Sequence, residues 1–331
     1  MKIWILTDDR IGSNNQSIAI GNNIGGECII KKVVYNKYIK IPNFIRQNSL
    51  IGIDKNKSDD LTNDLPDVVI CAGRRLSSVA LNIKKQSNGK TFVINIMNPN
   101  LNFGKFDLII LPKHDNTKDK ILKKYKNVIE TDGTLNLVNK ERIENETNKW
   151  FDTFKDYKKP IVSLIIGGDT KDYKFDSKQF GLMVKQLSEI INNLNGSLFI
   201  TTSRRTSDNC LKEIKENLKC EYYLYDWKED SKNNNVNNPY FAFLGISDFL
   251  IATGDSMSMV SECCSTGKPT YIYMPENSIA KKHRRFCENL IKNGVAKEFN
   301  SSISSLEIYN YTPLNEVEKV VDIIKSKIYK K

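Results

Sequence analysis

Short apolar runs alternate with amphipathic stretches along the whole chain. In the first half, apolar runs occupy residues 3–6, 27–35, 67–71, 92–96 and 107–111. Runs of this length, rich in Val and Ile and bounded by turn residues, are typical of buried parallel strands. Residues 14–24 and 77–85 instead carry apolar side chains at helical spacing, which predicts two helices between the strands.

The second half repeats this order. Its apolar runs predict strands at residues 161–166, 197–201, 221–225, 249–252 and 270–274, and helical spacing predicts helices at 178–193, 208–218 and 257–265. Alternation of strand, helix and strand implies right-handed crossovers. We therefore expect an α/β fold with one Rossmann-like, doubly wound parallel sheet in each half.

The length of the chain predicts two domains, because 331 residues exceed what one small core needs. We place the boundary in the polar stretch at residues 150–159, before Pro160. This gives an N-terminal domain over residues 1–155 and a C-terminal domain over 156–331. The last helix, with apolar residues from Val317 to Ile328 at helical spacing, is expected to pack back onto the N-terminal domain.

Composition is that of a globular protein, with 40% hydrophobic and 27% charged residues. The net charge of +11 comes from Lys and Arg spread along the chain among acidic residues. One interpretation is a solvated surface, and the other is attraction to anionic ligands or to an anionic membrane. Neither a nucleic-acid-binding motif nor a dense basic patch is present, so we expect no nucleic-acid partner.

Cysteine and histidine usage argues against a metal site. The seven cysteines are odd in number and lack CxxC spacing, and only two histidines are present. Most of the cysteines lie in apolar stretches, which favours a reducing, cytoplasmic location. The first ten residues do not resemble a signal peptide, and the longest apolar run is interrupted by Ser247 and Asp248, so no membrane span is expected.

The segment 253–262 carries the clearest candidate chemistry. It follows a predicted strand, and ligands of open α/β sheets bind at the carboxyl ends of strands. Ser256 is predicted to cap the next helix, whose N-terminus suits a phosphate. Glu262 lies six residues further on and could accept hydrogen bonds from ribose hydroxyls. The alternative is an ordinary strand–turn–helix with a surface glutamate.

Two other strand ends of the second half supply candidate ligand residues. Gly167 and Gly168 allow close approach of the backbone to a ligand. Ser203, Arg204 and Thr206 combine a guanidinium, which binds phosphate in a bidentate manner, with hydroxyl groups. Arg204 and Arg205 are adjacent and point in different directions, so one of them is expected to reach a ligand. The alternatives are a plain turn and a surface ion pair.

The first half offers candidates for acid–base catalysis. Asp8 follows the first strand and could act as a general base, and His114, followed by an acid, is a second candidate. Each could equally be an ordinary loop residue. The ligand-binding candidates of this half, which lie after the first and third strands, are Gly12, Asn15, Gln16, Gly73 and Arg74.

Taken in order, several of these segments resemble the mitochondrial fission elongated-mitochondria (ELM) family, including its bacterial members. The matching segments run from Thr7 to Pro269: TDDRIGSNNQ, PDVVICAGRR, INIMNPN, FDLIILPKHD, SLIIGGDT, TTSRRT and NNPYFAFLGISDFLIATGDSMSMVSECCSTGKP. TTSRRT and TGDSMSMVSECCSTGKP are long enough to be specific. The last segment is also similar to the donor motif of the enzyme that adds N-acetylglucosamine in peptidoglycan lipid synthesis, in which a helix glutamate binds ribose.

The resemblance implies a GT-B-like glycosyltransferase fold, in which two Rossmann-like domains face a central cleft. It implies a nucleoside-diphosphate sugar as donor substrate, no separate cofactor, and an acceptor that stays open between lipid and glycan. A lipid acceptor would bring peripheral membrane contact. The residues implied to line the donor site are Gly167, Gly168, Ser203, Arg204, Thr206, Asp255, Ser256, Met259 and Glu262.

One departure from the family pattern bears on catalysis. Relatives read Asp-Gly-Arg-x-Gly-His-Glu-Asn-Gln in the first loop, whereas this chain has Asp9, Ser13 and Asn14 in place of the glycine, histidine and glutamate. The leading hypothesis is a metal-independent glycosyltransferase with Asp8 or His114 as base. A non-catalytic binding or scaffold protein is the alternative. A nucleotide-sugar epimerase is a third, although the GxGxxG motif expected of a hydride-transferring epimerase is absent.

Overall fold

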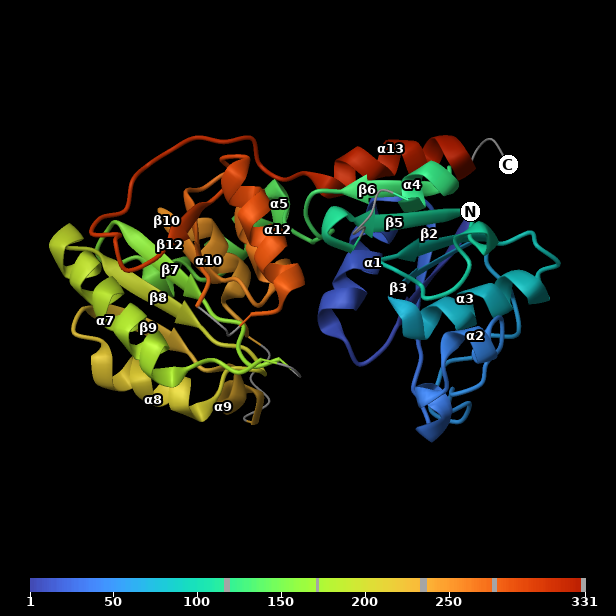
Figure 1. Ribbon diagram of the computed structural model, residues 1–331, viewed down its shortest axis with the longest axis horizontal. Helices are drawn as coiled ribbons and strands as arrows, with labels where there is room; N and C mark the ends of the chain where they lie inside the picture. Colours follow the sequence, from blue (N-terminus) through green and yellow to red (C-terminus); the bar gives the residue numbers. More distant parts are fainter. Residues whose placement is uncertain (116–119, 171–172, 233–236, 276–278, 329–331) are drawn as a thin grey trace. The chain divides into compact units, whose positions relative to one another are not determined.

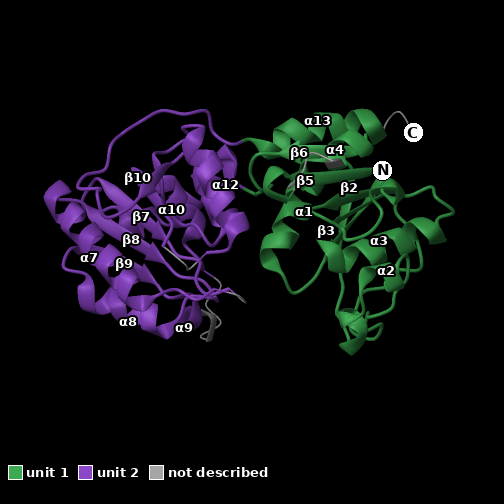
Figure 2. Cartoon of the chain, viewed as in Figure 1, with its two compact units in different colours: residues 1–137, 315–331 green, residues 138–314 purple. Residues whose placement is uncertain are grey.

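The computed structural model divides into two compact units, each built on a parallel β-sheet (Figures 1 and 2). It describes residues 1–115, 120–170, 173–232, 237–275 and 279–328. Unit 1 comprises residues 1–137 and 315–331, and unit 2 comprises residues 138–314. Within the described residues, no helix is long and apolar enough to cross a membrane.

The sheet of unit 1 has the strand order β2-β1-β3-β4-β5-β6, and all of its pairs are parallel. Its strands are β1 (Lys2–Thr7), β2 (Glu27–Lys32), β3 (Val68–Ala72), β4 (Phe92–Ile96), β5 (Leu108–Pro112) and β6 (Val128–Thr131). The central strands β3, β4 and β5 are buried along their whole length, whereas β2 at the edge alternates with exposed residues. This is the pattern of a sheet covered on both faces.

Different helices cover the two faces of this sheet. The helical segments of unit 1 are α1 (Ile11–Ile24), η1 (Lys37–Lys40), α2 (Asn43–Arg46), α3 (Arg74–Gln86), η2 (Phe103–Lys105), η3 (Lys113–Asp115), α4 (Lys120–Lys124) and α13 (Glu316–Ile328). Side chains of α3 pack with Trp4 and Leu6 on one face. Those of α1 and α13 pack with Ile3 and Ile5 on the other. Successive side chains of β1 therefore point to opposite faces of the sheet and contribute to two separate hydrophobic cores.

The sheet of unit 2 has the order β12-β11-β10-β7-β8-β9, again with parallel pairs. Its strands are β7 (Ile161–Ile165), β8 (Ser197–Thr201), β9 (Glu221–Tyr225), β10 (Phe249–Thr253), β11 (Thr270–Tyr273) and β12 (Lys297–Phe299). Its helices are α5 (Lys140–Lys149), α6 (Phe151–Phe154), α7 (Ser177–Leu194), α8 (Asp208–Asn217), α9 (Trp227–Lys232), α10 (Tyr240–Ile246), α11 (Met257–Ser265) and α12 (Lys281–Lys292).

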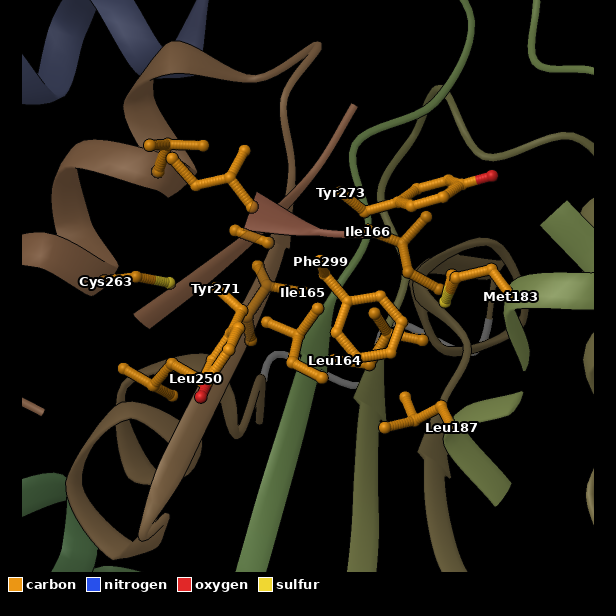
Figure 3. Packing of buried hydrophobic residues seen from close by; sticks show 14 of the residues in the cluster. Leu164, Ile165, Ile166, Met183, Leu187, Leu250, Cys263, Tyr271, Tyr273 and Phe299 are labelled. Carbon is orange, nitrogen blue, oxygen red and sulfur yellow. The ribbon is translucent and has the colours of Figure 1, made fainter. Parts of the chain in front are cut away.

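The main core of unit 2 joins this sheet to its helices. Figure 3 shows side chains of β7, α7, β10, α11, β11 and β12 meeting there, among them Leu164, Leu187 and Phe299. Leu198 and Ile200 of β8 face α7 and α8 in this core. Phe199, between them, points to the opposite face, where it meets side chains of α6 and α10. The fold class expected from the sequence, two doubly wound parallel sheets, is confirmed.

The division between the units differs from the boundary expected at residue 155. Residues 138–155, which the sequence analysis assigned to the N-terminal domain, belong to unit 2. The polar stretch in which the boundary was expected contains Phe154, which is 3% exposed and packs with Trp150, Tyr157 and Phe243. Three aromatic residues spaced by three or four positions thus make this stretch part of a core. Helix α13 packs on α1 in unit 1.

The order of the strands creates one switch point in each sheet. In unit 1 the chain leaves β1 for β2 on one side, and β3 lies on the other side. In unit 2, β8 and β10 flank β7 in the same way. Ligands of such sheets bind outside the carboxyl ends of the strands at the switch point, because the loops there diverge. The loops that follow β1, β3, β7 and β10 are therefore where a site is expected.

Candidate functional site

The loops after β7 and β10 are joined by direct hydrogen bonds at the switch point of unit 2. The Gly167 amide donates to Thr253 Oγ1 at 2.8 Å, and the Gly168 amide donates to Asp255 Oδ2 at 2.9 Å. Both glycines are required sterically. A Cβ on Gly167 would lie 2.2 Å from Asp255 Oδ2, and one on Gly168, whose φ is +130°, would lie 2.3 Å from a backbone oxygen.

The loop after β8 closes onto the same two glycines through hydroxyl groups. The hydroxyls of Ser203 and Thr206 both donate to the Gly167 carbonyl oxygen, Thr206 at 2.9 Å. Thr206 Oγ1 also accepts the Ser203 amide at 2.9 Å. Because these hydroxyls hold the loop, Ser203 and Thr206 position it, and their contact with a ligand stays a prediction.

The two adjacent arginines of this loop have different surroundings. Arg205 forms an ion pair with Asp255 at 2.8 Å and donates to the carbonyl oxygen of Gly168 at 2.9 Å. The Asp255 side chain is fully buried, and its Oδ1 has no partner among the described residues. Burial raises the pKa of Asp255, and the positive charge of Arg205 offsets this in part. Arg204 is exposed, and its guanidinium is the one free to meet a ligand.

Helix α11 begins directly after this cluster. Ser256 is its N-cap residue, but its side chain makes no capping hydrogen bond, so the predicted side-chain cap is wrong. Its backbone is held instead, since the Ser256 amide donates to the Thr253 carbonyl at 3.3 Å. The first N–H groups of a helix have no partner within the helix. Without a side-chain cap, those of α11 remain available to an anion. Met259, half-buried, packs against the core of unit 2.

Glu262 lies in the second turn of α11 and is not the surface residue of the alternative interpretation. Its side chain is buried, with the residue 7% exposed, and it accepts a hydrogen bond from the Tyr240 hydroxyl of α10. Burial raises the pKa of Glu262 to about 7, and the Tyr240 hydrogen bond and the charge of Arg142 offset it only in part. Among the described residues, no group is bonded to its other oxygen, Oε1.

At the switch point of unit 1, the Asp8 carboxylate is hydrogen-bonded to neighbouring residues. Its carboxylate accepts hydrogen bonds from the Arg10 amide at 2.9 Å and from Arg10 Nη2 at 2.6 Å, and from the Tyr35 hydroxyl at 2.8 Å. The Asp8 side chain is fully buried. Burial and the negative charge of Asp8 both raise the pKa of Tyr35 above its ordinary value. Asp8 thus orients Arg10, which is not the arrangement of a free general base.

The loop after β3 meets the loop after β1 through arginine side chains. Gly73, with φ of +77°, precedes α3, and a Cβ there would lie 3.2 Å from Arg10 Nη1. Arg75 Nη1 forms an ion pair with Asp9 at 3.0 Å. Arg74 is exposed at the start of α3. Gly73 and Arg74 therefore lie beside the first loop, as the strand ends predicted.

The amide residues of the first loop take different positions. Asn14 closes the loop, because its side chain both accepts from the Asp8 amide at 3.0 Å and donates to the Asp8 carbonyl at 2.8 Å. Asn15 is half-buried and Gly12 is exposed. Gln16 is 4% exposed and donates to the Gly12 carbonyl at 3.4 Å, while its Oε1 is buried without a partner among the described residues.

His114 lies in η3, after β5, and is half-buried. Strand β4 separates β5 from β3 in the sheet of unit 1, so His114 does not lie on the loops at the switch point of that unit. Within the described ranges, no group of three His, Cys, Asp or Glu side chains is placed to hold a metal ion. The positive groups at the switch points are arginines and helix N-termini, which suit a phosphate-bearing ligand.

Comparison with known families agrees with the motifs at these strand ends. The model of a family described as mitochondrial fission ELM1 matches residues 11–328. The chain belongs to this family. An uncharacterized protein of Rickettsia prowazekii (strain Madrid E) is 34% identical over 354 residues, covering 98% of both chains. The mitochondrial fission protein ELM1 of Arabidopsis thaliana is 27% identical over 285 residues, covering 80% of this ELM1-family chain and 64% of the plant protein.

Solved structures show where the fold of this ELM1-family protein belongs. The UDP-GlcNAc 2-epimerase from Neisseria meningitidis bound to UDP-GlcNAc has a TM-score of 0.54 at 14% identity, covering both chains fully. The UDP-GlcNAc 2-epimerase from Methanocaldococcus jannaschii, in complex with UDP-GlcNAc and UDP, has a TM-score of 0.53 at 12% identity, covering 98% of this chain and 100% of that one. The fold is thus of the GT-B type, with two Rossmann-like units.

The residues that hold the candidates in place could not be predicted from the sequence, apart from Arg10. Arg10 and Tyr35 bind Asp8, and Tyr240 binds Glu262, yet Tyr35 and Tyr240 lie 27 and 22 residues from their partners. A signal for Arg10 was present, because the family pattern keeps an arginine at its position. No local signal pointed to either tyrosine.

Proposed function

We propose that unit 2 binds a nucleoside-diphosphate sugar and that the protein transfers the sugar to an acceptor hydroxyl. The observation that carries this is the N-terminus of α11, which lies at the switch point without a side-chain cap. The exposed Arg204 adds a positive charge from the neighbouring loop. The two epimerases of the same fold are bound to UDP-GlcNAc, which supports this class of ligand.

In this proposal the protein stabilises the leaving nucleoside diphosphate. The α11 amides and the Arg204 guanidinium would bind the phosphate oxygens, on which negative charge grows as the bond to the sugar breaks. Glu262 would accept hydrogen bonds from the ribose hydroxyls through Oε1. The Asp8 carboxylate is occupied by Arg10 and Tyr35, so the proposal does not give it the role of base.

We expect nucleotide binding to depend on both Arg204 and Glu262. Thermal unfolding of the full chain with uridine, guanosine, thymidine and cytidine nucleotides and their sugars should show stabilisation by one base. Ligand at 100 times its Kd stabilises by about 2.7 kcal/mol. Arg204→Ala and Glu262→Gln should each reduce this shift. Glu216→Gln, on the exposed side of α8, is the matched control and should not. Unchanged shifts in both variants would remove the site assignment.

The raised pKa of Glu262 leads to a second, independent prediction, which concerns the stability of the protein. A carboxyl whose pKa is raised by folding stabilises the protein below its unfolded value near 4.5 and loses that contribution as the pH rises through about 7. Above pH 7 the buried charge is therefore a cost, and Glu262→Gln should be more stable than wild type by on the order of 2 kcal/mol at pH 8. Tyr240 can still donate to the glutamine oxygen.

Denaturant unfolding at several pH values measures this difference. The gain from Glu262→Gln should shrink as the pH falls toward 4.5, where wild type is itself protonated. A gain that does not change with pH would mean that the carboxylate is not buried in the way described. A gain in stability together with a loss of nucleotide binding would mark Glu262 as a residue kept for binding.

A second candidate function is nucleotide binding without turnover. The first loop supports it, since Ser13 stands where the family pattern has histidine. Release of nucleoside diphosphate from the donor that binds, measured with and without candidate glycan and lipid acceptors, separates the two functions. Release only with an acceptor would support transfer. Binding without release in any mixture would favour the non-catalytic function, and conversion of the sugar in place would favour an epimerase.

A further inference from the structure

Unit 1 contains a pocket that the proposed donor site does not use. It lies where the segment between β2 and β3 meets the start of α3, and its volume is about 550 Å³. Its lining combines apolar side chains with four basic ones, Lys40, Arg46, Arg74 and Arg75, and with the neutral Asn43 and Asn100. No carboxylate is among them.

The segment that forms one wall exposes large apolar side chains to solvent. Tyr38, Phe44, Ile45 and Ile51 are 52%, 71%, 57% and 46% exposed. The backbone at Gly52 approaches Ile39 closely, which brings Ile51 near Tyr38. Single exposed apolar residues are ordinary, but several on one short segment mark an interaction surface.

This segment is held firmly to the body of unit 1. The Asn43 amide group donates to the carbonyl oxygens of Arg74 at 2.6 Å and Pro99 at 2.8 Å. Arg46 is 1% exposed and donates to the Ile51 carbonyl at 2.9 Å. Phe44 and Ile45 are therefore exposed on a segment that hydrogen bonds fix to the rest of unit 1.

The charge of the pocket is strongly positive. Lys40 and Arg74 are exposed beside it. Arg46 is bonded to carbonyl and amide oxygens rather than to an acid, so its charge is not neutralised. Arg75 is paired with Asp9, which lies outside the lining. A cavity with several cations and no carboxylate attracts anions, and the start of α3 adds its dipole.

We propose that this pocket binds the phosphate of an anionic phospholipid, while Phe44, Ile45 and Tyr38 insert into the interfacial region of the same membrane. The combination of basic and exposed apolar side chains identifies this partner. Basic groups beside exposed aromatic and aliphatic side chains are what an anionic membrane surface binds. A soluble anion has no apolar part that could contact the exposed apolar side chains of this segment. The proposal stands apart from the donor site, since all of its residues lie in unit 1.

Co-sedimentation of the full chain with vesicles tests this. We expect binding to vesicles of phosphatidylcholine with phosphatidylglycerol and much weaker binding to phosphatidylcholine alone. Phe44→Ser with Ile45→Ser should weaken binding about tenfold or more through lost apolar insertion. Arg74→Gln and Lys40→Gln should each weaken it about fivefold. The apolar control is Leu182→Ser, 70% exposed on α7, and the charge control is Lys85→Gln, at the exposed end of α3.

The outcomes are distinct. Loss in the pocket variants with the two controls binding like wild type supports the proposal. Equal binding to both kinds of vesicle overturns it, because the anionic lipid would then not be recognised. Equal effects of pocket and control variants also overturn it, because the net charge would then explain the binding. Thermal stabilisation by glycerol phosphate without vesicle binding also overturns it in favour of a soluble ligand. Unfolding curves of the variants exclude misfolding as the cause, since the replaced side chains are exposed.

Discussion

Arg205→Ala is expected to lower the free energy of unfolding of unit 2 by about 3–5 kcal/mol, because it leaves the buried Asp255 carboxylate without its cation. The same change removes the hydrogen bonds that Arg205 gives to the Gly168 and Asp169 carbonyls. Denaturant unfolding followed by circular dichroism measures the loss. It should be larger at pH 8 than at pH 5. The pKa of Asp255, already raised by burial, rises further without Arg205, so a proton relieves the carboxylate at low pH.

Arg204→Ala is the matched control, one residue away. Arg204 is exposed, so its loss should change stability by no more than about 0.5 kcal/mol while weakening nucleotide binding. The double variant Arg205→Ala with Asp255→Asn should recover part of the stability, since no buried charge remains. Equal losses from the two arginines would contradict the division of roles between them.

Phe154→Ala is expected to cost about 3–5 kcal/mol of unfolding free energy, as other buried phenylalanines do. Phe154 is 3% exposed, and its ring lies 4.9 Å from Phe199 and 5.0 Å from Tyr223 between ring centroids. Truncation would leave a cavity among aromatic rings that cannot close around it. Denaturant unfolding of the full chain, with the slope compared between variants, measures the cost.

Phe151 supplies the control on the same short helix. It is 60% exposed, and Phe151→Ala should change stability by about 0.5 kcal/mol or less. Similar, small effects at both positions would mean that Phe154 does not belong to a core of unit 2.

Most of the fold could be predicted because its strands are short apolar runs closed by turn residues. The predicted ranges of β8, β9 and α11 agree with the structure at both ends. The boundary near residue 155 could not be placed correctly from local composition. Three of the four aromatic side chains of that stretch, Trp150, Phe154 and Tyr157, pack into a core, and only their partners on β8 and α10 reveal this.

The strand-end rule predicted where the candidate residues lie, since it depends only on parallel topology. It could not predict which side chains bind one another. Arg205 and Asp255 are 50 positions apart, and the pair exists because β7 lies between β8 and β10. The same strand order brings Gly167 to Thr253. Contact of these residues with a ligand stays a prediction until a nucleotide is tested.

The position of α13 has a consequence for synthesis on the ribosome. Unit 2 is one continuous stretch, whereas unit 1 needs residues at both ends of the chain. Val320, Val321 and Ile324 cover the same face of the unit 1 sheet as α1. The part of that face that α13 covers therefore stays exposed until translation reaches the last helix, by which time all of unit 2 has been made. Unit 2 is expected to fold first, and in a chain stalled before residue 315 the apolar surface that α13 covers would be accessible to chaperones.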